Sequence, residues 1–453
     1  MASFPDRSVI GSHQVVQLRR LLAALIPANG FYAKKLLAVG LTADIRSLDE
    51  FAQKVPFTTK QEIVEDQRAH PPYGTNLTFP IDRYTRFHQT SGTTSTPLRW
   101  LDTPESWDWM VESWTEIFSA AGATAGDRVF FAFSFGPFIG FWLAYEAAQR
   151  IGCLCIPGGG LNSAARLRVM IDNAATIVCC TPTYALRLAE VAAEEKIDLR
   201  AAPVKTLIVA GEPGGSIPAL RARLQELWPG ARIFDHHGMT EVGPVTYECP
   251  KCPGALHVIE SAYFAEVIQP GAGTTAGSGE PGELVLTTLG RTGSPLLRYR
   301  TGDVVRHGTR NSELGTPGLP PPAMIGRQPC ACGRHTLRLE GGILGRVDDM
   351  VVVRGVNIFP SAVDDLIRSS GEVAEYQVAT SKAHALTELS VRIEPVRDCA
   401  DPRGLVKRLE KSFQDAFALR VPVQTVAPGT LPRFELKAKR WVKTANQEDP
   451  SGT

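Results

Sequence analysis

The chain has 453 residues, with 48 Lys and Arg against 47 Asp and Glu, so its formal net charge at pH 7 is +1. This length predicts one large body plus a smaller domain, with enough chain to bury a sizeable core. A nearly neutral chain creates no field that gathers nucleic acid or an anionic membrane. Both are therefore excluded as expected partners, and a small molecule is favoured.

The N-terminal residues lack a basic stretch followed by an apolar one, so we expect neither a signal peptide nor a transit peptide, and a cytoplasmic location. The uncharged stretch 129–145 is close to the shortest membrane helix. Gly136 and Pro137 interrupt it, which predicts a buried strand, turn and helix instead of a membrane span. In a reducing compartment the nine cysteines are not expected to form disulfides.

From residue 105 onward, helical and strand patterns alternate along the chain. Apolar residues at helical spacing begin at Trp107, and the other predicted helices span 163–172 and 184–195. Strands are predicted at 129–133, 153–157, 175–180 and 204–210. This order predicts an α/β fold with a parallel sheet covered on both faces, and it places ligands at the carboxyl ends of the strands.

The pattern changes near residue 345. A Pro- and Gly-rich stretch at 314–323 is expected to be a surface loop. We predict an N-terminal domain over 1–344, with layered, mostly parallel β-sheets covered by helices. A small α+β domain is predicted over 345–453, with helices from Ser361 and Pro402 and a disordered end at 444–453.

A short loop rich in hydroxyl groups is a candidate phosphate-binding segment. Backbone N–H groups and hydroxyls in such a loop can bind phosphate oxygens, although the same pattern is typical of an ordinary turn. The loop consists of Thr90, Ser91, Gly92, Thr93, Thr94, Ser95, Thr96 and Pro97.

Further motifs follow this loop in a fixed order. They read AGEP at 210–213, HGMTE at 237–241, YRTGD at 299–303, GRVDDM at 345–350 with RGVNIFP at 354–360, and LPRFELKAKR at 431–440. Together with the hydroxyl-rich loop, this set resembles the adenylate-forming (AMP-binding) enzymes, and within them the phenylacetate-CoA ligase family. The resemblance implies that the C-terminal domain is a mobile lid carrying a catalytic lysine.

The activity that the resemblance implies is ATP-dependent formation of an acyl-adenylate with release of pyrophosphate, followed by transfer of the acyl group to coenzyme A. A carrier-protein thiol or an amine stays open as the acceptor, and so does an inactive, zinc-stabilised nucleotide-binding relative. The expected partners are a carboxylic acid, ATP and CoA, with Mg²⁺ as cofactor. A homodimer is one option for the assembly.

The resemblance also implies roles for individual residues in adenylation. Residues 91–96 would hold the β- and γ-phosphates, Glu241 would bind Mg²⁺, and Thr240 would face the α-phosphate. Asp303 would accept both ribose hydroxyls, and Lys437 would bridge the carboxylate and the α-phosphate. The other nucleotide-binding residues, which include the adenine wall, are Gly211, Glu212, Pro213, His237, Gly238 and Arg346.

The sequence departs from the family pattern at several of these positions. Ser95 and Thr96 replace a usual glycine and a frequent lysine, so the phosphate loop is one cation short. His237 stands in place of a usual tyrosine. Leu436 precedes the lysine where glycine is usual, so a backbone conformation with positive φ would be strained there.

The stretch 135–141 occupies the place where relatives form an aromatic-acid pocket. Phe135, Phe138 and Phe141 would provide apolar walls that suit an aryl or arylacetic acid, with Gly136 and His236 completing the lining. Plain core packing is the alternative role for these rings. The stretch has no basic residue to meet a second carboxylate, so a dicarboxylic acid is not expected.

For the thioester step, the resemblance implies a rotation of the C-terminal domain. Asp348 is the expected hinge, and Arg354 and Gly355 form the loop that approaches the adenylate, where a missing side chain admits pantetheine.

A second constellation joins Cys249, His257, Cys330 and Cys332. Thiolates with one imidazole are suited to a tetrahedral, structural zinc site, and some relatives carry a similar Cys-x-Cys-Gly-Arg run. Cys249 and Cys252 also have a zinc spacing, so Cys252 can replace His257 as the fourth ligand. Free thiols in loops are the alternative.

Overall fold

The computed structural model describes residues 4–90, 97–308, 329–354, 356–383, 386–435 and 437–444. The following lie outside these residues: the predicted phosphate loop 91–96, the predicted surface loop 314–323, Gly355, Leu436, and residues 445–453 of the predicted disordered end 444–453. Across the part of the chain that is described, no helix has both the length and the apolar character needed to cross a membrane.

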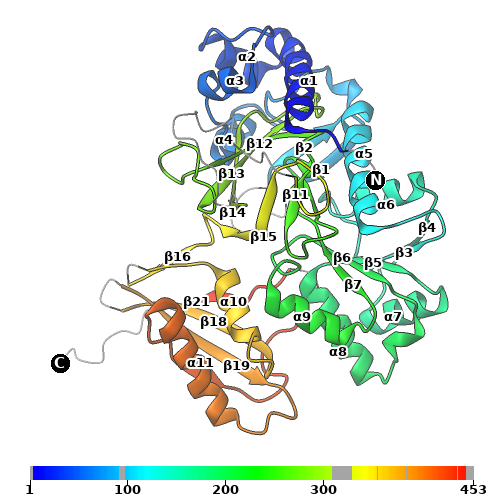
Figure 1. The fold of residues 1–453 in the computed structure, drawn as a ribbon, viewed down its shortest axis with the longest axis vertical. Coiled ribbons are helices and arrows are strands. Elements are labelled where there is room, and N and C mark those ends of the chain that lie inside the picture. The colour runs from blue at the N-terminus through cyan, green and yellow to red at the C-terminus, as the bar shows by residue number, and fades with distance from the viewer. Residues whose placement is uncertain are drawn as a thin grey trace.

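The chain begins with a helical layer that lies at the top of the molecule in Figure 1. Leu18, Leu22, Tyr32 and Phe51 belong to the buried core of this layer. The next helix, Lys60–Ala69, begins with a capping box at Thr59, which satisfies N–H groups at its start. This layer consists of α1 (Arg7–Ala28), α2 (Gly30–Leu37) and α3 (Leu48–Lys54), and the chain continues through α4 (Lys60–Ala69), η1 (Ile81–Arg83) and the antiparallel pair β1 (Arg86–Gln89) and β2 (Arg99–Asp102).

A five-stranded parallel sheet follows, with the order β4-β3-β5-β6-β7. Alternate residues of β3 enter separate cores: Val129 and Phe131 belong to one and Phe130 to the other. This confirms the predicted α/β unit with both sheet faces covered. The strands are β3 (Arg128–Phe131), β4 (Leu154–Pro157), β5 (Ile177–Cys180), β6 (Thr206–Val209) and β7 (Arg232–Asp235); the helices are α5 (Pro104–Ala121), α6 (Trp142–Arg150), α7 (Ser163–Asp172), α8 (Pro182–Glu194), η2 (Leu199–Ala201) and α9 (Pro218–Leu227).

A six-stranded antiparallel sheet, in the order β10-β11-β15-β14-β13-β12, adds a second layer, so the expectation of mostly parallel sheets holds for the five-stranded sheet and not for this one. Its register places Asp303 directly opposite Arg346. The strand β15 ends at Arg346, so it runs across the expected domain boundary between 344 and 345. The strands are β10 (Thr246–Glu248), β11 (Leu256–Val258), β12 (Tyr263–Ile268), β13 (Pro281–Thr288), β14 (Tyr299–His307) and β15 (Arg338–Arg346), and a short hairpin of β8 (Gly238–Met239) and β9 (Gly243–Pro244) precedes them.

The C-terminal part is an α+β unit with a core of its own, which includes Ile367, Val378, Leu409 and Phe413. Its four-stranded sheet has the order β20-β19-β18-β21. The predicted helices from 361 and 402 are confirmed. The elements are β16 (Val351–Val353), β17 (Val356–Ile358), α10 (Pro360–Arg368), β18 (Val373–Ala383), β19 (Leu386–Pro395), α11 (Pro402–Phe417), β20 (Val423–Thr425) and β21 (Trp441–Lys443).

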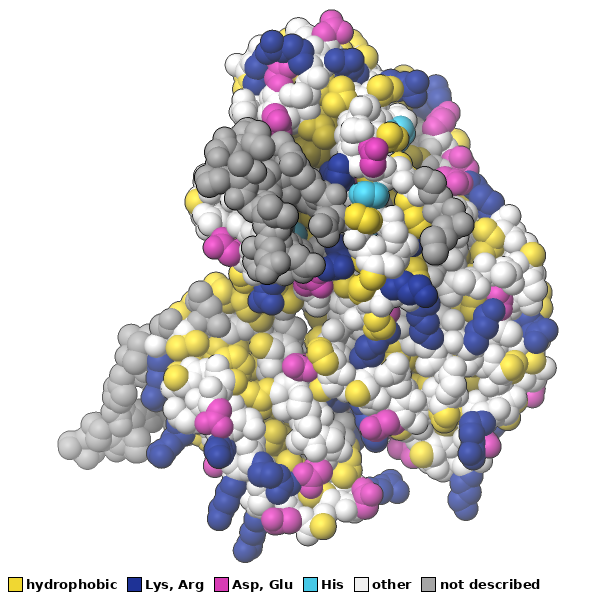
Figure 2. Space-filling view, viewed as in Figure 1, with side chains coloured by type: hydrophobic (Ala, Val, Ile, Leu, Met, Phe, Trp, Pro, Cys, Tyr) yellow, Lys and Arg dark blue, Asp and Glu magenta, His cyan; other side chains and the backbone are white. Residues whose placement is uncertain are grey.

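The C-terminal unit lies beside α8 and α9 at the lower end of the molecule (Figure 1). The backbone N–H of Ala219 on α9 donates to Asp365 on α10 over 3.2 Å. On the face shown in Figure 2, basic and acidic side chains are mixed across the surface, as the nearly neutral composition leads one to expect.

Candidate active site

Several of the predicted nucleotide-binding residues follow the carboxyl ends of parallel strands, as the α/β prediction required, whereas Asp303 and Arg346 lie on the antiparallel strands β14 and β15. Gly211 lies just after β6 and has φ +94°, while His236 and His237 lie just after β7. The predicted phosphate loop connects the paired strands β1 and β2. At its base Thr90 N donates to Leu98 O over 2.9 Å.

The side chain of Asp303 is buried, and one of its carboxylate oxygens, Oδ2, can still accept a hydrogen bond. Its side chain is 3 % exposed, and Oδ1 accepts a hydrogen bond from Arg346 Nη1 over 3.2 Å. His237 Nε2 lies 3.1 Å from Asp303 Oδ2. Neither of these two atoms has a hydrogen bond to another described residue. A buried carboxylate oxygen in this state can accept a hydroxyl hydrogen, which fits the ribose role.

Thr240 and Glu241 are buried, and a buried arginine holds their backbone. Arg291 donates to the carbonyl oxygens of both residues, over 2.9 and 2.8 Å. It also forms a bidentate pair with Asp102, with both N–O distances at 2.7 Å and both side chains fully buried. Lys60, at the start of α4, places its Nζ 3.8 Å from Glu241 Oε1.

The segment that carries Lys437 enters the same region. A methyl group built on Gly211 would lie 3.6 Å from Cε of Lys437, so the lysine side chain lies beside the predicted adenine wall. The carboxylate of Glu212 accepts hydrogen bonds from the backbone N–H groups of Thr183 and Ala438, each over 2.9 Å. Glu212 therefore joins the start of α8 to the residue after Lys437.

The predicted hinge and thioester-loop residues are placed differently. Asp348 is exposed and accepts from Arg346 Nε over 2.9 Å, which keeps it next to the nucleotide residues. Arg354 has φ +48° and pairs with Glu388 of β19, with Nε 2.9 Å from Oε1. In this arrangement Arg354 therefore binds within the C-terminal unit.

The predicted acyl-pocket residues belong to a dense aromatic cluster. Phe141 is buried, and its ring centroid lies 6.0 Å from that of Trp114. The ring of His236 lies 4.4 Å from that of Trp114. Phe135 and Phe138 are half-buried at the edge of the same core.

His236 links this aromatic cluster to the nucleotide residues. Burial lowers the pKa of His236 to about 3, so the ring is neutral near pH 7. Its Nδ1–H donates to Thr246 O over 2.7 Å, which leaves Nε2 as an acceptor. Glycine is required at position 238, two residues after His236, because a Cβ there would lie 2.8 Å from Gly243 O.

The structure brings the predicted metal ligands together. One ligand atom from each of Cys249, His257, Cys330 and Cys332 lies within 4.8 Å of all the others. The Sγ atoms of Cys249 and Cys330 are 3.5 Å apart, close to the separation of about 3.8 Å that two thiolates on tetrahedral zinc require. Cys252 Sγ lies 3.9 Å from Cys330 Sγ, but Cys252 is not part of this set of four.

Thr336 orients the imidazole of His257. The Nδ1 of His257 lies 2.8 Å from Thr336 Oγ1, while Nε2 faces Cys332 Sγ at 3.4 Å. A hydrogen bond on the distal ring nitrogen fixes the orientation of a metal-binding histidine. The donor set and its support therefore fit a closed zinc site.

Sequence reasoning missed three residues that act near this site: Asp102, Arg291 and Lys60. Asp102 and Arg291 are 189 residues apart, so no local motif connects them. The residues next to Lys60 and Arg291 in the sequence are polar or Gly, so no local signal singles these two out. Lys60 brings a cation next to Glu241 in a site whose loop has Thr96 where lysine is frequent.

Comparison with known proteins defines the class. Residues 82–290 match the AMP-binding enzyme family and residues 355–444 match the AMP-binding enzyme C-terminal domain. The phenylacetate-coenzyme A ligase of Aromatoleum evansii is 30% identical over 432 residues, covering 92% of this chain and 90% of that protein. The Thermus thermophilus enzyme of the same name is 28% identical over 450 residues, covering 95% of both chains.

With the fold and the assembled motifs, these matches make the chain an adenylate-forming, AMP-forming acid-CoA ligase. Within that class it belongs to the phenylacetate-CoA ligase family.

Solved structures of a similar 2-hydroxyisobutyryl-CoA ligase record two states with which the arrangement of this chain can be compared. The postadenylation state of that ligase, in complex with 2-HIB-AMP, has a TM-score of 0.88 at 27% identity and covers 98% of this chain and 91% of its own. The thioesterification state, with 2-HIB-AMP and CoA, has the same identity and coverage but a TM-score of 0.70. The arrangement of this chain is therefore closer to the postadenylation state.

Proposed function

We propose that the chain activates an aromatic or arylacetic acid with ATP as an acyl-adenylate, releases pyrophosphate and transfers the acyl group to coenzyme A. The observation that supports this acid class is the aromatic cluster around Trp114, Phe135 and Phe141. It meets the nucleotide residues at His236, which is adjacent in sequence to His237 beside Asp303. Apolar rings at that position favour an aryl group over a charged one.

In this proposal the residues of the chain bind and orient the reacting groups. Asp303 accepts the ribose hydroxyls through its buried carboxylate. Lys437 places an ammonium beside Gly211, where negative charge grows on the α-phosphate as the carboxylate attacks. When bound, Mg²⁺ neutralises phosphate charge, and Glu241 would hold it with Thr240 next in the chain.

Domain motion is part of the proposal. Residues 1–344 would bind ATP and the acid, and residues 345–453 would act as a mobile lid that turns about Asp348. Support comes from the separate core of the C-terminal unit and from the different TM-scores to two states of one ligase. The turn would remove Lys437 and bring Arg354 and Gly355 to the adenylate.

We also propose that Cys249, His257, Cys330 and Cys332 hold one structural zinc ion. The closeness of the four ligand atoms supports this set, and the contact from Thr336 supports His257 as the fourth ligand. Four protein ligands would close the site, so it would stabilise the fold without taking part in catalysis.

The test is a screen of carboxylic acids for acid-dependent pyrophosphate release and hydroxamate formation, with and without CoA. Aryl and arylacetic acids are expected to give the highest kcat/KM, and a thioester is expected to accumulate when CoA is present. Short hydroxy acids belong in the screen because a similar structure is that of a 2-hydroxyisobutyryl-CoA ligase.

The possible results separate the parts of the proposal. A preference for short hydroxy acids would refute the aromatic class and leave adenylation standing. Pyrophosphate release without a CoA thioester would point to a carrier thiol or an amine as acceptor. No acid-dependent pyrophosphate release with any acid would indicate an inactive nucleotide-binding relative.

A further inference from the structure

The segment 433–440 is tied to α8 on both sides of Lys437. On one side Glu212 accepts from Ala438 N and, with its other oxygen, from Thr183 N at the start of α8, both over 2.9 Å. Glu212 follows Gly211, so it is part of the strand-end loop where the nucleotide residues gather. One carboxylate thus fixes the backbone next to Lys437 relative to the parallel sheet.

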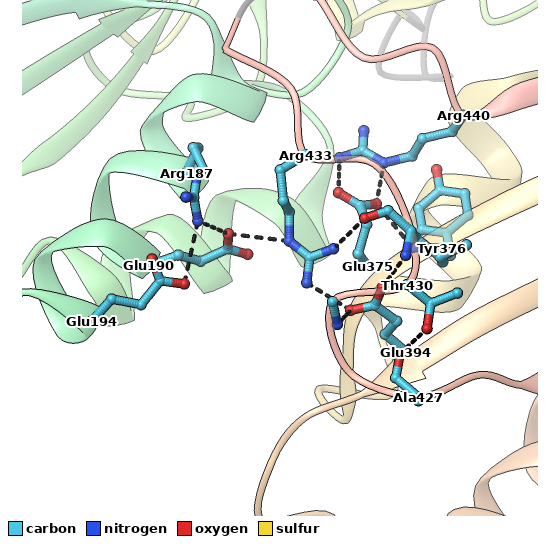
Figure 3. Close-up of polar contacts among 12 residues, drawn as sticks. Arg187, Glu190, Glu194, Glu375, Tyr376, Glu394, Ala427, Thr430, Arg433 and Arg440 are labelled. Atoms are coloured by element: carbon cyan, nitrogen blue, oxygen red, sulfur yellow. Dashed lines mark hydrogen bonds and ion pairs between the residues drawn. The ribbon is translucent and has the colours of Figure 1, made fainter. Parts of the chain in front are cut away.

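A second contact lies before Lys437 in the chain (Figure 3). Arg433 Nε is 3.4 Å from Glu190 Oε2 on α8, and Arg433 Nη2 donates to Glu394 Oε2 on β19 over 2.7 Å. Glu394 is almost fully buried and also accepts from the backbone N–H of Gly429 over 3.0 Å. Arg433 therefore bridges the C-terminal sheet and α8.

The far end of the segment is anchored as well. Arg440 forms a bidentate pair with Glu375 on β18, over 2.6 and 3.0 Å, as Figure 3 shows. Its Nη1 lies 3.5 Å from the Thr183 hydroxyl. Two direct contacts to α8, from Arg433 and Arg440, and one contact from Ala438 that runs through Glu212 thus frame the lysine.

We propose that Glu212 is a positioning residue for Lys437: its carboxylate holds the Ala438 backbone so that the ammonium points at the adenylation site, and the Glu190–Arg433 pair supports the same arrangement. This inference rests on the proposed adenylation role of Lys437. A charged acceptor with two N–H donors is a strong contact, whereas the Glu190–Arg433 pair is 31% and 26% exposed and therefore weaker.

The contact acts in one half-reaction. It joins the C-terminal unit to the large part of the chain in an arrangement closer to the postadenylation state than to the thioesterification state, and the proposed rotation of the lid would break it. Glu212→Gln keeps the shape of the side chain but turns an amide group toward one of the two N–H donors. The loop should then sample other positions, and Lys437 should reach the α-phosphate less often.

The experiment measures acid-dependent pyrophosphate release, with phenylacetate as the first acid, and thioester formation from presynthesised acyl-adenylate. Glu212→Gln should lower kcat for pyrophosphate release by about ten- to a hundredfold. Glu190→Gln should lower it by about two- to fivefold. Glu194→Gln is the matched control, because Glu194 pairs with Arg187 on the same helix face and not with Arg433. Thioester formation should stay near wild type in Glu190→Gln and Glu194→Gln, and in Glu212→Gln it should fall by much less than pyrophosphate release does.

A double-mutant cycle separates positioning from a direct role. If Glu212 acts through Lys437, adding Glu212→Gln to Lys437→Ala should cause almost no further loss. If Glu212 instead contacts adenine, KM for ATP should rise in both backgrounds, and this outcome would overturn the inference. Hydrogen exchange at the Ala438 amide gives a readout independent of turnover, and it should speed up in Glu212→Gln and not in Glu194→Gln.

The two proposals fail in different ways. Normal pyrophosphate release by Lys437→Ala would refute the role of the lysine itself. A slow Lys437→Ala together with an unaffected Glu212→Gln and unchanged exchange at Ala438 would refute the positioning role alone. Should Glu212→Gln fail to fold, comparison of Glu190→Gln with Glu194→Gln still decides whether contacts to α8 matter for adenylation.

Discussion

At the scale of single residues, Arg291 shows how a buried charge can organise a site that it does not enter. Its guanidinium is satisfied by the Asp102 carboxylate and by the carbonyl oxygens of Thr240 and Glu241. Removing one partner of a buried pair leaves an uncompensated charge, which costs about 3–5 kcal/mol. Arg291 therefore fixes the backbone around Glu241.

We expect Arg291→Met to lower the free energy of unfolding by about that amount and to slow pyrophosphate release. Urea denaturation measures the first effect. Arg150→Met is the matched control, because Arg150 pairs with Asp108 at the surface and such pairs contribute about 0–1 kcal/mol. Equal losses of unfolding free energy in Arg291→Met and Arg150→Met would contradict the structural role assigned to Arg291.

The ribose-binding role proposed for Asp303 leads to a separate prediction about nucleotide binding. Asp303→Ala removes the charged acceptor proposed for the ribose hydroxyls, so the affinity for ATP should fall by about 1.5–3 kcal/mol, measured by calorimetry. Dideoxy-ATP is the matched ligand, since it should bind the wild type more weakly than ATP does. The variant should bind ATP and dideoxy-ATP alike. An unchanged affinity of Asp303→Ala for ATP would remove the ribose assignment.

At the scale of elements, the proposed zinc site ties together segments that are far apart in the chain. Cys249 follows β10, His257 lies on β11, and Cys330 and Cys332 precede β15. These strands are neighbours in the antiparallel sheet. A metal at this point would fasten the edge of that sheet and the chain that leads into β15.

Elemental analysis of protein purified without chelator should find about one zinc per chain. Cys332→Ser and His257→Ala should each lose the metal and lower the midpoint of thermal unfolding, because binding energy of structural zinc is folding energy. Cys252→Ser should keep it. Loss of zinc in Cys252→Ser and retention in His257→Ala would reassign the fourth ligand.

At the scale of the whole molecule, the arrangement of the two parts decides which half-reaction a residue serves. Lys437→Ala should slow acid-dependent pyrophosphate release by about a hundred- to a thousandfold, because the ammonium acts mainly in the transition state. If the lid turns about Asp348, the same variant should convert presynthesised acyl-adenylate to thioester at near wild-type rate.

The control for Lys437→Ala is Lys439→Ala, which alters an exposed lysine two residues further on. Severe loss of adenylation in Lys439→Ala, with little effect in Lys437→Ala, would show that the motif is read in the wrong register. An equal fall in both half-reactions of Lys437→Ala would contradict the rotating lid.

The sequence predicted the α/β class and four of the five parallel strands, because hydrophobic periodicity and turn residues act within a few residues of one another, but it did not predict β7 or the helices α1 to α4 and α9. It also determined the family, because the motifs are short and keep their order. The predicted helix at 163–172 coincides with α7, and the strand at 153–157 differs from β4 by one residue.

The tertiary structure alone decided which distant residues meet. The antiparallel sheet places Asp303 opposite Arg346, and packing of the C-terminal unit brings Lys437 to Gly211 and Ala438 to Glu212. The partnership of Arg291 with Asp102 also belongs to this level. Such contacts join segments tens to hundreds of residues apart, and their stability depends on burial and on geometry that no local pattern encodes.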